Sequence, residues 1–99
     1  MNNLIASYDL NRASQDYPRV ISAIRALGMA AELQQSVWFV ASLATAAEAV
    51  ERVWAAMDPT GALLVVDATN NEALIKPTDS EAAADLADGW TRSWQSRVS

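Results

Sequence analysis

The chain has 99 residues, and its seven Lys and Arg against twelve Asp and Glu give a net charge of −5. It contains no His and no Cys, which excludes ordinary zinc and haem sites, a Cys nucleophile and a Ser-His-Asp triad. A chain of this length forms one domain that buries about 65% of its unfolded surface. Any chemistry must rest on carboxylates, hydroxyls, Arg and a hard metal ion, and the acidic charge argues against strong sequence-independent binding of nucleic acid.

The first predicted element is a strand over Asn3–Asp9, because the apolar run is short and turn-prone residues follow it. Because side chains alternate along a strand, one face carries Leu4, Ala6 and Tyr8. The other face carries Ile5, Ser7 and Asp9. Neither face is clearly polar, which is typical of a central strand with something packed on each side. The strand delivers the carboxylate of Asp9 to its carboxyl end.

A helix is predicted from about Tyr17 to Leu27, with Asp16 as its N-cap and Pro18 near its first position. Its apolar residues recur at helical spacing, and Gly28 ends it.

Two strands are predicted next, over Met29–Gln35 and Ser36–Ala41. The second is rich in aromatic and β-branched residues and is the strongest strand signal in the chain. It also has apolar side chains on both faces, among them Trp38, which we expect to be core packing.

A second helix is predicted from about Thr45 to Met57, capped by Ser42 or Thr45, with Trp54 on its buried face. A turn then leads to a strand over Ala62–Asp67, whose Leu and Val residues run without alternation.

Two further elements are predicted after this strand. Residues Ala73–Lys76 form a short fifth strand that Pro77 terminates. Asp79 or Ser80 caps a last helix that reaches about Gln95 and carries Trp90 and Trp94 on its apolar stripe.

The order of these elements predicts an α+β ferredoxin-like βαββαβ sandwich with a short fifth strand and a C-terminal helix. We expect a single domain over residues 1–99, with a core at 1–76 and a helical extension at 77–99. Both helices of the core should lie on one face of an antiparallel sheet. Because the strands are apolar on both sides, the second face needs a cover, either a second copy of the chain or the Trp90/Trp94 helix.

Several short motifs resemble one known family. They are Tyr8-Asp9 at the end of the first strand, Gln35-Ser36-Val37-Trp38 entering the third, and Asp58-Pro59 followed by Ala62 to Val66. In this order they resemble the small CRISPR-associated adaptation protein family "Cas two" over Met1 to about Lys76. The resemblance is greater to its standalone SinR-like relatives, which have an opening Tyr-Asp-Leu and then Gln-Asp-Tyr, here residues 8–10 and 15–17. VapD-type toxins share the same fold group.

The resemblance implies a ferredoxin-like homodimer, sheet against sheet, in which Asp9 of each protomer faces the other. Where members are nucleases, this Asp pair is proposed to hold a divalent metal such as Mg²⁺. Two close carboxylates need such a cation between them or a shared proton, and the metal can polarise a phosphoryl oxygen and activate water. Ser7 and Ser36 are candidates for secondary contacts. The chain departs from the adaptation proteins at Phe39 and Val40, where they usually carry an acidic continuation, and in its acidic charge.

Each candidate site has an alternative interpretation. Asp9 is either a catalytic metal ligand or a cap of the following loop. Arg12, Arg19 and Arg25 form either a phosphate-contacting patch or a solvated helix face. Trp90 and Trp94 either stack on a partner or dock the last helix, and Asp67 is a weaker second carboxylate.

Two functions follow from these expectations. The first is a dimeric, non-catalytic scaffold or regulator, favoured by the acidic charge and by the lack of His for general acid–base catalysis. The alternative is a Mg²⁺-dependent endonuclease on RNA or DNA that uses paired Asp9. A nucleic-acid partner is disfavoured by charge. No apolar run approaches the about 20 residues that span a bilayer and no signal peptide is visible, so we expect a cytoplasmic protein without a membrane partner.

Overall fold

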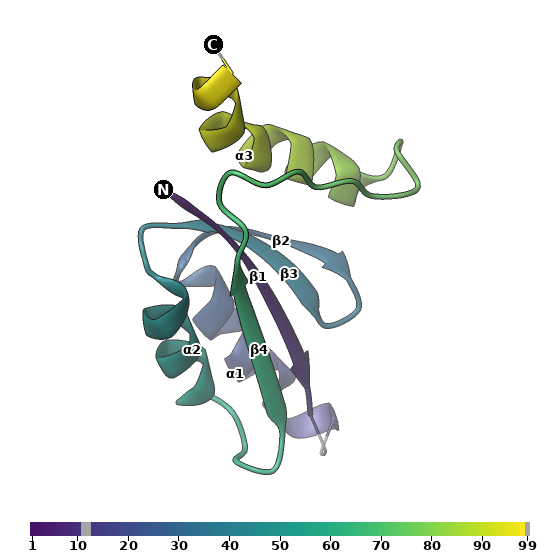
Figure 1. Cartoon of the computed structure of the whole chain (residues 1–99). Coiled ribbons are helices and arrows are strands. Elements are labelled where there is room, and N and C mark those ends of the chain that lie inside the picture. Colours follow the sequence, from purple (N-terminus) through teal and green to yellow (C-terminus); the bar gives the residue numbers. More distant parts are fainter. Residues whose placement is uncertain (11–12, 99) are drawn as a thin grey trace.

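A computed structural model of the chain describes residues 1–10 and 13–98, with side chains described at residues 1–10 and 17–90. The architecture is α+β (Figure 1). In chain order the elements are β1 (Asn2–Asp9), α1 (Ala13–Arg25), β2 (Gly28–Gln34), β3 (Val37–Ser42), α2 (Ala46–Trp54), β4 (Ala62–Asp67) and α3 (Glu81–Val98). The strands form an antiparallel sheet in the order β2-β3-β1-β4, so β1 lies inside the sheet and β4 at one edge.

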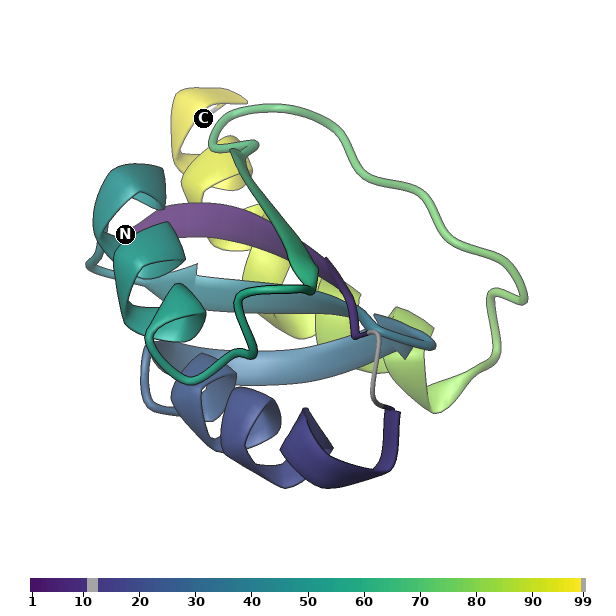
Figure 2. The same cartoon turned by 90° about the horizontal axis from the view of Figure 1, so that it is seen from below.

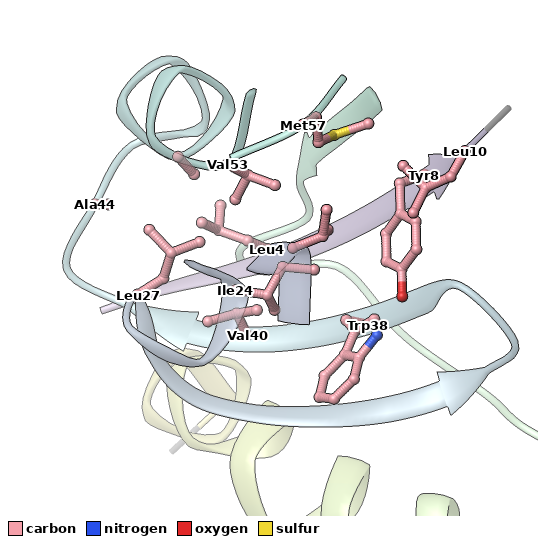
Figure 3. Packing of buried hydrophobic residues seen from close by; sticks show 12 residues of the cluster. Leu4, Tyr8, Leu10, Ile24, Leu27, Trp38, Val40, Ala44, Val53 and Met57 are labelled. Atoms are coloured by element: carbon pink, nitrogen blue, oxygen red, sulfur yellow. The ribbon is translucent and has the colours of Figure 1, made fainter. Parts of the chain in front are cut away.

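Helices α1 and α2 pack together against one face of the sheet, as the sequence predicts, and build the larger core there (Figure 3). Val20 and Ile24 of α1 and Val53 of α2 are fully buried. Burying each such side chain contributes about 1.5–3 kcal/mol. The sheet side of this cluster is formed by alternate residues of the two inner strands, which are Leu4, Tyr8, Trp38 and Val40. The alternation along β1 therefore directs Leu4, Ala6 and Tyr8 to this face.

Helix α1 begins earlier than predicted. It starts at Ala13, so Asp16 lies within the helix and is not its N-cap, and Pro18 is an interior residue. Tyr17 packs on Tyr8 of β1 with ring centroids 5.8 Å apart, and this tertiary contact holds the turn that contains the proline. Gly28 begins β2, where a Cβ would overlap the carbonyl oxygen of Ala41.

Helix α2 is capped by Thr45, one of the two predicted candidates. The Thr45 side chain accepts from the Glu48 N–H at 3.1 Å, and the Glu48 carboxylate accepts from the Thr45 N–H at 2.9 Å, which is a capping box. Ser42 is instead buried, and its hydroxyl donates to the Leu27 carbonyl at 2.6 Å. The predicted burial of Trp54 is wrong: it is 39% exposed at the end of α2, while Val53 and Met57 occupy the core positions.

Helix α3 packs on the opposite face of the sheet, mainly over β2 and β3 (Figure 1). Its N-terminus is capped by Ser80, whose hydroxyl accepts from the Ala83 N–H at 3.1 Å. A Cβ at Gly89 would lie 2.7 Å from atoms of both Met29 and Phe39, so this glycine permits the close approach of α3. The buried residues of this second cluster are Phe39, Ala41, Leu86 and Trp90.

The predicted fifth strand at Ala73–Lys76 is wrong. Residues 72–75 have no regular secondary structure and follow a turn at Asn70, which has a φ of 70°. Ala73 and Ile75 pack against the second cluster, so the apolar residues that suggested a strand are used to contact α3 and the sheet face. The connecting segment, residues 68–80, joins β4 to α3 and does not pair with the edge of the sheet (Figure 2).

Candidate functional site

One half of the second sheet face is not covered by α3. The cross-strand pairs of this half are Ser7 with Leu64 and Ile5 with Val66. Leu64 is 60% exposed and Val66 is 43% exposed, although both lie within the sheet. We call Ser7, Leu64 and Val66 the open surface. Of the two covers that the sequence predicts for this face, α3 lies over β2 and β3 and leaves this half exposed in the single chain.

Asp9 lies at the end of the open surface. It is exposed, it is the last residue of β1, and its position two residues after Ser7 places it on the same face. Its cross-strand partner is Ala62, which follows Gly61. A Cβ on Gly61 would lie 2.9 Å from the Asp9 carbonyl oxygen, so Gly61 allows the turn before β4 to lie against the end of β1.

Asp67, the second carboxylate candidate, lies at the opposite end of the sheet. It pairs with Leu4, whereas Asp9 pairs with Ala62, five residues earlier on β4. Five residues of strand correspond to about 17 Å. The two carboxylates therefore cannot bind the same metal ion within one chain. Among the described residues, no group of three or more Asp and Glu is arranged to hold a metal ion.

Asp67 has a local structural role. Its Oδ1 accepts from the Thr69 hydroxyl and from the Thr69 N–H at 3.0 Å. These bonds, the hydroxyl bond first, hold the pKa of Asp67 below its ordinary value of 3.8. The Thr69 hydroxyl oxygen also accepts from the Asn3 N–H at 3.0 Å, which ties this turn to β1.

Replacing Asp67 with asparagine should therefore lower stability in a pH-dependent way. The carboxylate is largely solvent-exposed, so we expect the free energy of unfolding at pH 6 to fall by less than about 1 kcal/mol. A lowered pKa gives stability above the unfolded value that is lost as pH falls through the folded value. The difference from the wild type should thus shrink below pH 3.8. Urea titrations across this range test it, with Glu51→Gln on α2 as the control; a difference that persists at low pH would contradict the assignment.

The predicted arginine patch does not join Asp9. Arg19 and Arg25 are exposed residues of α1, which lies on the other face of the sheet, and Arg12 lies outside the described residues. The Arg25 guanidinium lies 5.1 Å from the centre of the Trp38 ring, a cation–π contact that fixes it on the core side. Ser7 lies on the open surface, while Ser36 lies in the β2–β3 turn with a φ of 63° and its carbonyl accepts from the Tyr8 N–H at 3.1 Å.

Trp90 anchors α3 to the sheet. It is buried, its ring centroid lies 5.3 Å from that of Phe39, and its indole N–H donates to the Asn71 carbonyl at 2.8 Å. The side-chain amide of Asn3, which is also buried, donates to the Trp90 carbonyl at 3.2 Å. Asn3 has no recognisable motif in the sequence, and its role depends on a contact 87 residues away. The side chain of Trp94 lies outside the described residues.

Comparisons of the chain with protein-family models, with curated proteins and with solved structures found no match. Among the described residues, none of the helices has both the length and the apolar character needed to cross a membrane.

Proposed function

We propose that the protein is a ferredoxin-like interaction module that forms a homodimer through the open surface. The order of β1 to β4 along the chain and the sheet order β2-β3-β1-β4 support the ferredoxin-like description. The observation that carries the proposal is the exposure of Leu64 and Val66 on a sheet face. Each Å² of apolar surface removed from water contributes about 25 cal/mol, so a matching surface on a second copy favours association.

A second copy fits this surface for a geometric reason. The open surface lies on β1 and β4, and Ser7, on a strand that pairs with both β3 and β4, places a small side chain next to the apolar Leu64. Sheet faces of this kind pack against one another in sandwiches at about 10 Å. A twofold dimer uses the same residues on both sides. Light scattering over the micromolar range tests this proposal, with the expected mass twice the 10.7 kDa of the chain.

We place the protein, as a proposal, with the standalone SinR-like relatives of the "Cas two" adaptation proteins. The residues that support this proposal are Tyr8 and Asp9, which end β1, and Trp38, which lies in β3. A scaffold or regulatory role accords with the acidic charge and the absence of His from the sequence.

A metal-dependent phosphodiesterase is the second candidate, and the position of Asp9 favours it. Asp9 is exposed on the same face as Ser7, so a dimer whose twofold axis passes near this end of β1 would bring two Asp9 carboxylates together. Such a pair repels unless a hard cation such as Mg²⁺ lies between the carboxylates. A bound Mg²⁺ would polarise a phosphoryl oxygen.

The Asp9→Asn variant tests this second candidate. If the Asp9 pair holds the metal, cleavage of RNA or DNA in Mg²⁺ should fall at least about 100-fold, as the loss of a metal ligand costs no less than the loss of its supporting partners. Dimer mass should be unchanged, because asparagine keeps the size of the side chain. Asp67→Asn, at the far end of the sheet, is the matched control. If the Asp9→Asn variant cleaves as fast as the wild type, the paired-carboxylate mechanism is excluded. The dimer proposal does not depend on this result.

A further inference from the structure

The negative charge of the chain is concentrated in one segment. Residues 67–90 contain six acidic residues and one basic residue, Lys76, and so account for the whole net charge of −5. The acidic residues are Asp67, Glu72, Asp79, Glu81, Asp85 and Asp88. The other residues of the chain contain six acidic and six basic residues and are neutral overall. Asp67 is on the face of the sheet that also carries Leu4, whereas the other five acidic residues belong to the connecting segment and the first part of α3, so most of the charge lies on the α3 side of the sheet (Figure 1).

An apolar groove lies within this acidic layer. Its volume is about 420 Å³. Ile5 and Val37 of the sheet form one side, Leu74 of the connecting segment another, and Leu86 and Trp90 of α3 a third.

The border of the groove combines apolar exposure with negative charge. Leu74 is 88% exposed, the most exposed large apolar side chain among the described residues. Glu72 is exposed and also lines the groove. Asp85 and Asp88 belong to the same helix as Leu86, which lines the groove, and they lie together on a different side of α3 from Leu86. An apolar hollow between two acidic segments is complementary to a ligand with apolar and cationic residues.

We propose that this groove binds a cationic amphipathic segment of another protein. Apolar side chains at helical spacing would enter the groove, and Lys or Arg residues would face the acidic segments on both sides of it. A second copy of this chain is a poor occupant, because two grooves facing each other would bring two segments of charge −5 together. Nucleic acid is disfavoured by the same charge. The proposal goes beyond self-association, since none of Ser7, Leu64 and Val66 lines the groove, although Ile5, the cross-strand partner of Val66, does.

The test uses calorimetric titration of the full chain with a synthetic peptide of about four helical turns, with Leu at i, i+3, i+4 and i+7 and Lys elsewhere. We expect binding with a dissociation constant in the micromolar range at low salt, weakened about tenfold when added salt shortens the Debye length to about 3 Å. A peptide with Glu in place of Lys and one with Ser in place of Leu should not bind measurably.

Two matched pairs of variants locate the site. Leu74→Ser should weaken binding at least threefold, whereas Leu43→Ser, which alters a side chain that is 82% exposed after β3, should not. Glu72→Lys should weaken binding more than Glu51→Lys on α2, although both change the net charge equally. Equal effects within each pair, or no binding of the Leu–Lys peptide to the wild type, would overturn the proposal. Light scattering of the same variants distinguishes this failure from failure of the dimer, because none of the four residues belongs to the open surface.

Discussion

Replacing Leu64 with glutamate is expected to convert the proposed dimer into a monomer at micromolar concentration. Leu64 is 60% exposed in the single chain, and it pairs with Ser7 at the middle of the open surface. Its substitution removes apolar burial and places a charge where water would be excluded. A twofold interface contains each residue twice, so the cost is doubled. We expect the dissociation constant to rise more than about 100-fold, which corresponds to about 3 kcal/mol.

Sedimentation velocity over a range of concentrations measures this change. Leu43→Glu is the matched control, since Leu43 is also a highly exposed leucine but lies in the loop after β3. Circular dichroism should show both variants folded, because substitutions of exposed residues typically change stability by less than about 0.5 kcal/mol. A Leu64→Glu protein that remains dimeric would place the interface elsewhere, and a monomeric wild type would reject the dimer.

Replacing Trp90 with alanine is expected to lower the free energy of unfolding by about 3 kcal/mol, the lower end of the range for a buried aromatic residue. The variant loses the ring contact with Phe39 and the hydrogen bond from the indole N–H to the Asn71 carbonyl. We expect a loss of stability at the lower end of this range because Trp90 also borders the groove. Water can therefore occupy part of the space left by the ring.

Urea unfolding followed by circular dichroism measures this loss of stability. Trp54→Ala provides the control, because Trp54 is 39% exposed at the end of α2 and should cost less than about 1 kcal/mol. If the two variants lose stability equally, then α3 is not held to the sheet by Trp90, and the groove would lose one of its walls.

The sequence predicts much of the fold because local signals agree with tertiary packing there. The aromatic and β-branched run in β3 and the capping residue Thr45 of α2 are such cases. At other positions tertiary contacts outweigh the local preference of the sequence. Pro18 lies inside α1, where Tyr17 contacts Tyr8, and Ala73 and Ile75 pack on the sheet face and not in a strand.

The candidate site is only partly readable from the sequence. Period 2 along β1 places Asp9 on the same face as Ser7, and the apolar residues of β4 indicate a second buried face. Which half of that face α3 covers depends on Gly89, Asn3 and Trp90, which meet only in the folded chain. No pattern in the sequence predicts that Leu64 and Val66 stay exposed.

The alternation along β1 has a consequence for how this protein can change. Leu4, Ala6 and Tyr8 are buried toward α1 and α2, whereas Ser7 and Asp9 lie on the opposite face. One strand thus carries two independent sets of requirements, one for folding and, in the proposed dimer, one for recognition. Drift at Ser7, Leu64 and Val66 can redirect partner choice while the hydrophobic interior stays intact, so homologues with the same interior are free to associate in different ways.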